Sequence, residues 1–176
     1  MLILLTGGSA NGKSHYAEEL CLRLPAPRYY VAAMRPHSKQ DEEKINQKRR
    51  LRQQRGFSGT FDCYTDLAGL TLPQRGTVLL ECLCNLTANE MFDADGQFTD
   101  PVPAVLDGIA ALRQQCGHLL VVTNDTGNDS RAYDAATDAY VQALGRINAL
   151  LAQQADSVCE LVCGIPIWLK GKEPSV

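Results

Sequence analysis

A glycine-rich motif near the start of the chain is the first candidate for a functional site. Residues 7–14 fit the phosphate-loop pattern GxxxxGK(S/T), a glycine-rich turn followed by a lysine and a hydroxyl residue. Glycines let backbone N–H groups turn inward around a phosphate, and the following helix directs its positive end at the same anion. We therefore predict a site that takes ATP or GTP as substrate. The predicted binding residues are Gly7, Gly8, Ser9, Ala10, Asn11, Gly12, Lys13 and Ser14.

The same motif predicts which side chains serve the phosphates and a metal. Lys13 is expected to reach the β- and γ-phosphates as a catalytic cation, and Ser14 to ligate Mg²⁺. A phosphate loop also needs a carboxylate, and two apolar runs end in Glu81 and Asp125. Side chains at the carboxyl ends of parallel strands point toward the ligand crevice. We favour Glu81 as the catalytic or metal-binding acid and leave the general base open.

The elements that position these residues alternate along the chain. Apolar runs predict strands at 2–6, 29–33, 77–82, 119–123, 158–163 and 165–169. Helical spacing predicts helices near 12–24, 41–55, 101–112 and 134–154. Alternating strands and helices indicate an α/β fold with a mainly parallel sheet and helices on both faces. Without a repeat or linker, one domain over 1–176 with a polar tail at 170–176 is the simplest interpretation.

Composition argues against several other classes of protein. The chain has 176 residues and a net charge of −3, so general nucleic-acid binding is not expected. No apolar run approaches the roughly 18 residues of a membrane span, and the first run is interpreted as a strand rather than a signal peptide. The seven cysteines show no CxxC spacing. We interpret them as reduced thiols rather than a disulfide framework or zinc site, and expect a cytoplasmic protein.

Further motifs follow the phosphate loop in order. They are Tyr-Val-Ala-Ala-Met at 30–34, Leu-Leu-Glu-Cys at 79–82 with Asn85 and Asn89, Val-Val-Thr-Asn-Asp at 121–125, Leu-Gly-Arg-Ile-Asn at 144–148 and Val-Cys-Gly-Ile-Pro at 162–166. With the loop they cover almost the whole chain. In this combination the chain resembles the bifunctional adenosylcobinamide kinase / adenosylcobinamide-phosphate guanylyltransferase family of cobalamin biosynthesis.

The resemblance implies a fold, two reactions and more site residues. The fold would be a RecA-like P-loop domain, assembled as a homotrimer. A nucleoside triphosphate would phosphorylate the aminopropanol hydroxyl of adenosylcobinamide, the corrinoid partner. GTP would then guanylylate that phosphate, giving adenosylcobinamide-GDP and pyrophosphate. By the same resemblance, nucleotide contacts extend to Ala32, Ala33, Met34, Asp62 and Glu81, with Asp62 standing for a glutamate.

One position departs from the family pattern. The family's second reaction passes through a GMP-histidine, three residues beyond a basic residue and an isoleucine. Lys44 and Ile45 match that pair, which puts Lys48 at the histidine's position. Lys48 could be a guanylylated nucleophile, a cation on the triphosphate, or part of a solvated basic face with Arg52 and Arg55. The guanylyl transfer could also have been lost.

The three histidines lie elsewhere in the chain. We interpret His15, after the loop, as a surface residue and His118, before a strand, as structural. His37 precedes the basic helix and is the candidate to replace the missing histidine. Two other functions stay open: a different small-molecule P-loop kinase, for which Lys13, Ser14 and Glu81 would suffice, and a nucleotide-binding regulatory protein without chemistry.

Overall fold

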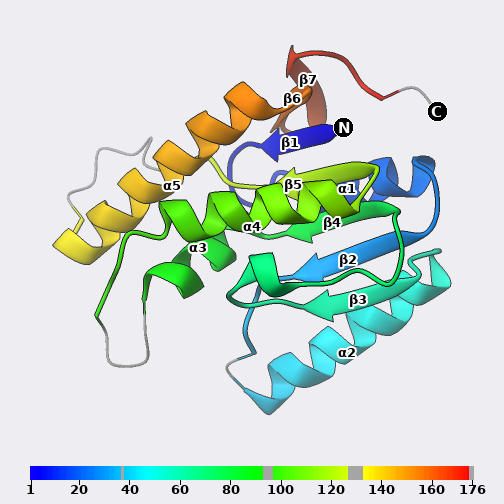
Figure 1. The fold of residues 1–176 in the computed structure, drawn as a ribbon, viewed down its shortest axis with the longest axis horizontal. Helices are drawn as coiled ribbons and strands as arrows, with labels where there is room; N and C mark the ends of the chain where they lie inside the picture. Colours follow the sequence, from blue (N-terminus) through cyan, green and yellow to red (C-terminus); the bar gives the residue numbers. More distant parts are fainter. Residues whose placement is uncertain (37, 93–96, 127–132, 175–176) are drawn as a thin grey trace.

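The computed structural model describes residues 1–36, 38–92, 97–126 and 133–174. Seven strands form one sheet in the order β3-β2-β4-β5-β1-β6-β7 (Figure 1). The strands are β1 (Leu2–Thr6), β2 (Arg28–Ala32), β3 (Gly59–Asp62), β4 (Thr77–Glu81), β5 (His118–Val122), β6 (Ser157–Val162) and β7 (Ile165–Lys170). The helices are α1 (Lys13–Arg23), α2 (Lys39–Gln54), the short 3₁₀ turn η1 (Leu67–Gly69), α3 (Leu83–Met91), α4 (Val102–Gln115) and α5 (Ala135–Gln154).

The sheet is parallel from β3 to β6. Leu4 of β1 pairs with Val121 of β5 on one side and with Val158 of β6 on the other. One strand, β5, separates β1 from β4, which is the arrangement expected of a RecA-like P-loop domain. β7 runs antiparallel to β6 after a tight turn in which Cys163 and Gly164 both have positive φ. The predicted α/β fold with a mainly parallel sheet is therefore confirmed.

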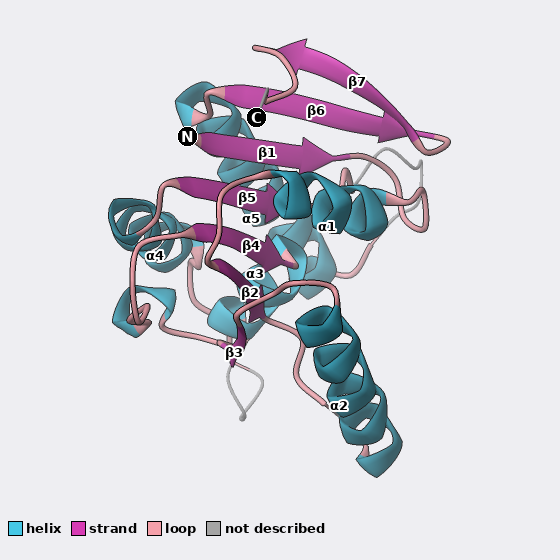
Figure 2. Cartoon of the chain, turned by 90° about the vertical axis from the view of Figure 1, so that its right-hand side faces the viewer, coloured by secondary structure: helices cyan, strands magenta, loops and turns pink. Residues whose placement is uncertain are grey.

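Helices cover both faces of the sheet, as predicted. Two buried clusters mark the faces: α3, α4 and α5 contribute Leu86, Ile109 and Leu144 to one, while α1 contributes Leu20 and other residues to the second. Figures 1 and 2 show α2 extending from the sheet near its β3 edge. No residue of α2 is buried among those whose side chains the structure describes, so this helix is held by its polar contacts.

Some local features differ from the sequence expectation. β3 and α3 were not predicted from the sequence. Helix α2 begins at Lys39 rather than at residue 41, because the Ser38 hydroxyl accepts a hydrogen bond from the Asp41 N–H at 3.2 Å and caps the helix. Helix α4 begins at Val102, whose N–H donates to the Asp100 carboxylate at 3.1 Å. Predicted helix starts are thus correct to within one or two residues.

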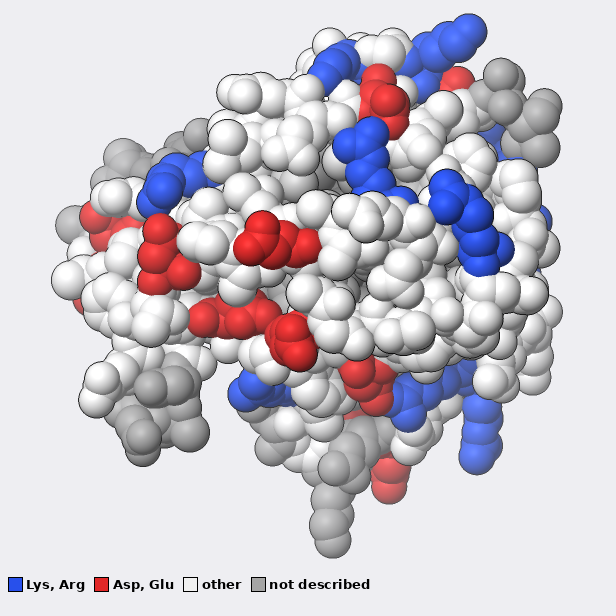
Figure 3. All heavy atoms as spheres, in the orientation of Figure 1, with Lys and Arg blue, Asp and Glu red and all other residues white. Residues whose placement is uncertain are grey.

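The cysteines, the helices and the surface charge concern the classes of protein that the composition argues against: disulfide-stabilised, membrane-spanning and nucleic-acid-binding proteins. All seven cysteines are free thiols. Among the described residues, no helix combines the length and the apolar character needed to cross a bilayer. Figure 3 shows acidic and basic side chains interspersed on the face that α4 covers. Over the described part of that face, no continuous basic stripe is visible.

Two helical glycines give a matched test of the packing. A Cβ at Gly108 of α4 would lie 2.7 Å from the Leu67 Cβ of η1, whereas a Cβ at Gly145 of α5 would meet nothing within 4 Å. We expect Gly108→Ala to lower the free energy of unfolding by about 1–3 kcal/mol through overpacking. Gly145→Ala should raise it by about 0.5–1 kcal/mol, because alanine loses less backbone entropy in a helix. Urea unfolding measures both, and equal effects would contradict this packing.

Candidate nucleotide-binding site

The phosphate loop joins β1 to α1 and has the backbone conformation that its glycines permit. Gly7 and Gly12 have φ values of 132° and 92°, in the left-handed region. A Cβ at Gly7 would lie 2.6 Å from the Leu161 carbonyl oxygen, which is backbone and cannot move aside easily. The loop therefore needs glycine at this point both for its conformation and for its close approach to β6.

Lys13 lies folded back into the loop. Its Nζ donates to the Gly8 carbonyl at 2.5 Å and to the Asn11 Oδ1 at 3.3 Å, and the residue is only 6% exposed. The Asn11 amide in turn donates to the Leu161 carbonyl of β6. Burial lowers the pKa of Lys13, while the thiols of Cys82 and Cys84 and the Glu81 carboxylate act in the opposite direction. The loop thus wraps around the Lys13 ammonium at the carboxyl end of the parallel strands.

A cavity of about 450 Å³ opens over the loop. It is lined by Ser9, Ala10, Asn11, Gly12, Lys13, Ser14, His15, Glu81, Cys82, Val122 and Asn124. The cavity brings together most of the predicted loop residues and one of the two strand-end acids. Gly7 and Gly8 are not among the lining residues, but Gly8 holds the Lys13 ammonium. Asp125 is not among them either; its N–H donates to the Gly7 carbonyl at 3.2 Å.

A second, more apolar pocket of about 110 Å³ adjoins this cavity. Its lining residues are Tyr30, Ala32, Met34, Ile45, Lys48, Arg52, Glu81, Cys82 and Asn85. Ala32 and Met34, for which the resemblance predicts nucleotide contacts, both line this pocket. Ala33 does not: its side chain is buried in the core, its N–H donates to the Glu81 carbonyl and its own carbonyl accepts from Asn89.

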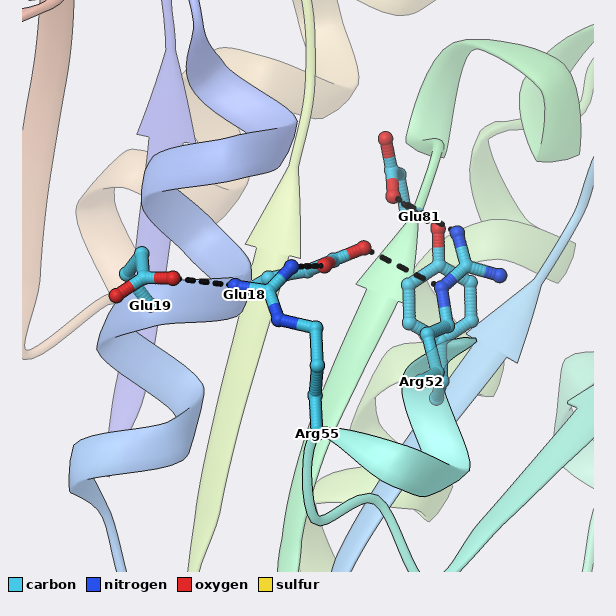
Figure 4. Close-up of polar contacts among 6 residues, drawn as sticks. Glu18, Glu19, Arg52, Arg55 and Glu81 are labelled. Atoms are coloured by element: carbon cyan, nitrogen blue, oxygen red, sulfur yellow. Dashed lines mark hydrogen bonds and ion pairs between the residues drawn. The ribbon is translucent and has the colours of Figure 1, made fainter. Parts of the chain in front are cut away.

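A groove between α1 and α2 forms the third part of the site. It is lined by Ser14, Glu18, Lys48, Leu51, Arg52, Arg55 and Glu81. Arg55 pairs with Glu18 at 2.7 Å and also with Glu19, so part of the predicted basic face is neutralised by acids of α1 (Figure 4). Lys48 is exposed at this groove. Glu81 lines both pockets and the groove, and so lies where all three meet.

The structure brings Asp62 to a different place from the phosphate loop. Its carboxylate pairs with Arg49 of α2. The two residues line a separate pocket with Pro36, Ile45, Asn46 and Tyr64. Asp62 is thus not a lining residue of the groove that holds Ser14 and Lys48, although Ile45 lines both its pocket and the apolar one.

The histidines divide by position. His15 is exposed and lines the loop cavity. His118 begins β5 at the opposite end of the strand from the loop, and burial lowers its pKa. His37 lies outside the described residues. The sequence did not identify Asn85 as a site residue, although it lies in one of the family motifs. Arg52 was predicted only as part of the basic face with Lys48 and Arg55, and its contacts with other elements were not predicted.

The residues present fit a magnesium ion. Mg²⁺ prefers oxygen ligands and shares its coordination with substrate phosphates and water. The Ser14 hydroxyl and the Glu81 carboxylate both face the phosphate-loop cavity and the groove. Ser14 is exposed, so its oxygen is accessible to such an ion. These two oxygen donors are the residues that would hold it.

The buried lysine gives a pH-dependent test. The unfolded chain titrates Lys13 near the ordinary value of about 10.4, whereas burial lowers the pKa in the folded chain. Between these values the unfolded chain binds more protons, so the contribution of Lys13 to the free energy of unfolding increases as pH rises. Lys13→Met removes this contribution. We expect the stability of the unmodified chain, relative to Lys13→Met, to increase up to about pH 10.5 in urea unfolding. A difference that does not change with pH would contradict the burial.

Known proteins resemble this chain along nearly its whole length. The sequence profile of the family described as "Cobinamide kinase / cobinamide phosphate guanyltransferase" matches residues 3–169. The "Bifunctional adenosylcobalamin biosynthesis protein CobU" of Salmonella typhimurium is 28% identical over 185 residues, which cover 97% of this chain and 100% of the relative. The Escherichia coli protein of the same name is 26% identical over 183 residues, with 97% and 100% covered. Among solved structures, a type III secretion system ATPase aligns with a TM-score of 0.49 and 11% identity over 92% of this chain and 51% of that one. The chain belongs to the cobinamide kinase / cobinamide phosphate guanyltransferase family.

Proposed function

We propose that this chain uses ATP or GTP, with Mg²⁺, to phosphorylate the aminopropanol hydroxyl of adenosylcobinamide. The observation that carries the proposal is the position of Glu81, which lines the phosphate-loop cavity, the apolar pocket and the α1–α2 groove at once. Family membership over residues 3–169 supports the corrinoid as acceptor. We propose that the enzyme works in the cytoplasm as a homotrimer of one-domain subunits, each formed by residues 1–176.

The reaction needs positioning and charge stabilisation more than covalent chemistry. The loop N–H groups and Lys13 would bind the β- and γ-phosphates and stabilise the charge on the transferring phosphoryl group. Mg²⁺, when bound, neutralises charge on the phosphate oxygens. Ser14 and Glu81 would hold that ion. The apolar walls formed by Ala32 and Met34 suit the face of a nucleobase.

We propose that Lys48 acts on the polyphosphate as a cation and not as a covalent nucleophile. Its side chain is exposed at the groove that also holds Ser14 and Glu81. An ammonium on a flexible stem is a common phosphate binder in the form of a point charge. Guanylyl transfer on this chain would then need no covalent intermediate at position 48.

Turnover separates the candidate functions. We expect the unmodified chain with MgATP or MgGTP to convert adenosylcobinamide to its phosphate, as measured by mass spectrometry. Lys13→Met should lower this rate by more than about a hundredfold, because the principal cation on the phosphates is lost. Lys172→Met, an exposed lysine on the C-terminal segment, is the matched control and should not change the rate. Nucleotide binding without turnover would support a regulatory protein, and turnover of another alcohol would support another kinase.

The intact mass of the protein tests the role of Lys48. After incubation with GTP and Mg²⁺ we expect no increase by one guanylyl group. Lys48→Met should weaken nucleotide binding, whereas Lys48→Arg should largely keep it, because arginine retains the charge. A guanylyl adduct on the unmodified chain that Lys48→Met abolishes would show that Lys48 is a nucleophile after all.

A further inference from the structure

Arg52 of α2 contacts three groups from three other elements. Its guanidinium lies over the Tyr30 ring of β2, with Cζ 3.4 Å from the ring centroid. Its Nε lies 3.3 Å from the Glu18 carboxylate of α1, and its Nη2 lies 4.0 Å from the Glu81 carboxylate at the end of β4. The Arg52 side chain is only 11% exposed. Figure 4 shows the guanidinium with dashed contacts to both carboxylates, Glu18 from α1 and Glu81 from β4.

Tyr30, Arg52 and Glu81 all contact one another. Its hydroxyl donates to Oε2 of Glu81, the same oxygen that faces Arg52. Burial raises the pKa of Tyr30 well above its usual range, and the neighbouring Glu81 raises it further. The phenol therefore stays protonated and remains a donor at neutral pH. Arg52 stacks on Tyr30, and both residues contact the same carboxylate oxygen of Glu81.

The chemistry of these contacts calls for arginine. A guanidinium is planar, so it can stack on an aromatic ring while its edge pairs with carboxylates on both sides. Such a cation–π contact is strongest where the pair is shielded from water. A lysine at this position would keep the charge and lose the stacking. Glu18 is fixed in turn by Arg55 at 2.7 Å, so Arg52 is anchored on the α1 side as well.

We propose that Arg52 is a positioning residue, which holds the Glu81 carboxylate at the junction of the phosphate-loop cavity, the apolar pocket and the α1–α2 groove. Arg52 acts on the bound nucleotide and its metal through Glu81. The inference rests on the proposed nucleotide-dependent function. It adds that helix α2, by the pairing of Arg52 with Glu18 and Glu81, sets the geometry of an acid that belongs to the central sheet.

A purely structural role for Arg52 makes a different prediction. Arg52 also joins α2 to α1, so its loss could simply loosen α2, which buries no described residue of its own. In that case the effect of removing Arg52 would not depend on whether Glu81 carries a charge. If Arg52 works through Glu81, its effect disappears once the Glu81 carboxylate has been replaced. A double-mutant cycle separates the two roles.

The cycle uses Arg52→Met, Glu81→Gln and the double variant, and two measurements are made on each. Calorimetry gives the affinity for ATP with and without Mg²⁺, and steady-state kinetics gives kcat and KM with adenosylcobinamide. We expect Arg52→Met alone to lower kcat by about 10- to 100-fold, because a displaced catalytic group can cost that much. KM for ATP should change less than kcat. In the Glu81→Gln background, Arg52→Met should change neither the affinity for ATP nor kcat by more than about twofold.

Companion variants keep the result interpretable. Arg50→Met, an exposed arginine on the same helix, is the matched control and should behave as the unmodified chain. Arg52→Lys should recover part of the Mg²⁺-dependent affinity, because it restores the charge. If Arg52→Met does not fold, Glu18→Gln removes the other anchor of Arg52 and should give a smaller effect that also requires Glu81.

Different outcomes would contradict the positioning role of Arg52 and the corrinoid substrate. Equal effects of Arg52→Met with and without the Glu81 carboxylate, in Mg²⁺-dependent binding, would overturn the positioning role. Absence of turnover by the unmodified chain would instead contradict the corrinoid substrate. The binding arm of the cycle needs no corrinoid, so it still decides whether Arg52 acts through Glu81.

Discussion

The site depends first on one buried cation. The ammonium of Lys13 is held by the Gly8 carbonyl and the Asn11 amide oxygen inside the phosphate loop. Asn11 ties the same loop to the Leu161 carbonyl of β6. Burying the Lys13 ammonium costs free energy, and hydrogen bonds to polyphosphate oxygens would offset that cost. The positive φ values of Gly7 and Gly12 let the backbone close around that charge.

The site depends next on Glu81, an acid that lies beside both the phosphate loop and α2. β4 places Glu81 at the same end of the strands as the loop, with β5 between β4 and β1. Tyr30 and Arg52 reach this carboxylate from β2 and α2. The phosphate loop follows a strand whose first four residues are buried, whereas α2 has no buried residue among its described side chains. The candidate site therefore joins a loop on the buried sheet to a helix whose ion pairs and stacking on Tyr30 hold it beside α1 and β4.

Sequence patterns predicted much of this arrangement, and the reasons for the rest are physical. The loop and the buried strands carry strong local signals: glycines at fixed spacing and uninterrupted apolar runs. β3 has only four residues and is half-buried, and α3 follows β4 directly, so neither has a clear period. The pairing of Asp62 with Arg49 and the position of Arg52 are tertiary contacts between residues on different elements. Asp62 was expected at the nucleotide by resemblance, and Ala33 likewise, but Asp62 lines a separate pocket and the Ala33 side chain faces the core.

The turn around Lys13 is expected to bind the anionic end of a nucleoside triphosphate. Isothermal titration calorimetry of the unmodified chain with ATP and with GTP, each in the presence of Mg²⁺, tests it most directly. The structure predicts saturable binding of at least one of the two, with the stoichiometry of one site per chain, and no such binding to Lys13→Met. Failure of the unmodified, folded chain to bind either nucleotide would contradict the claim, and so would undiminished binding by Lys13→Met.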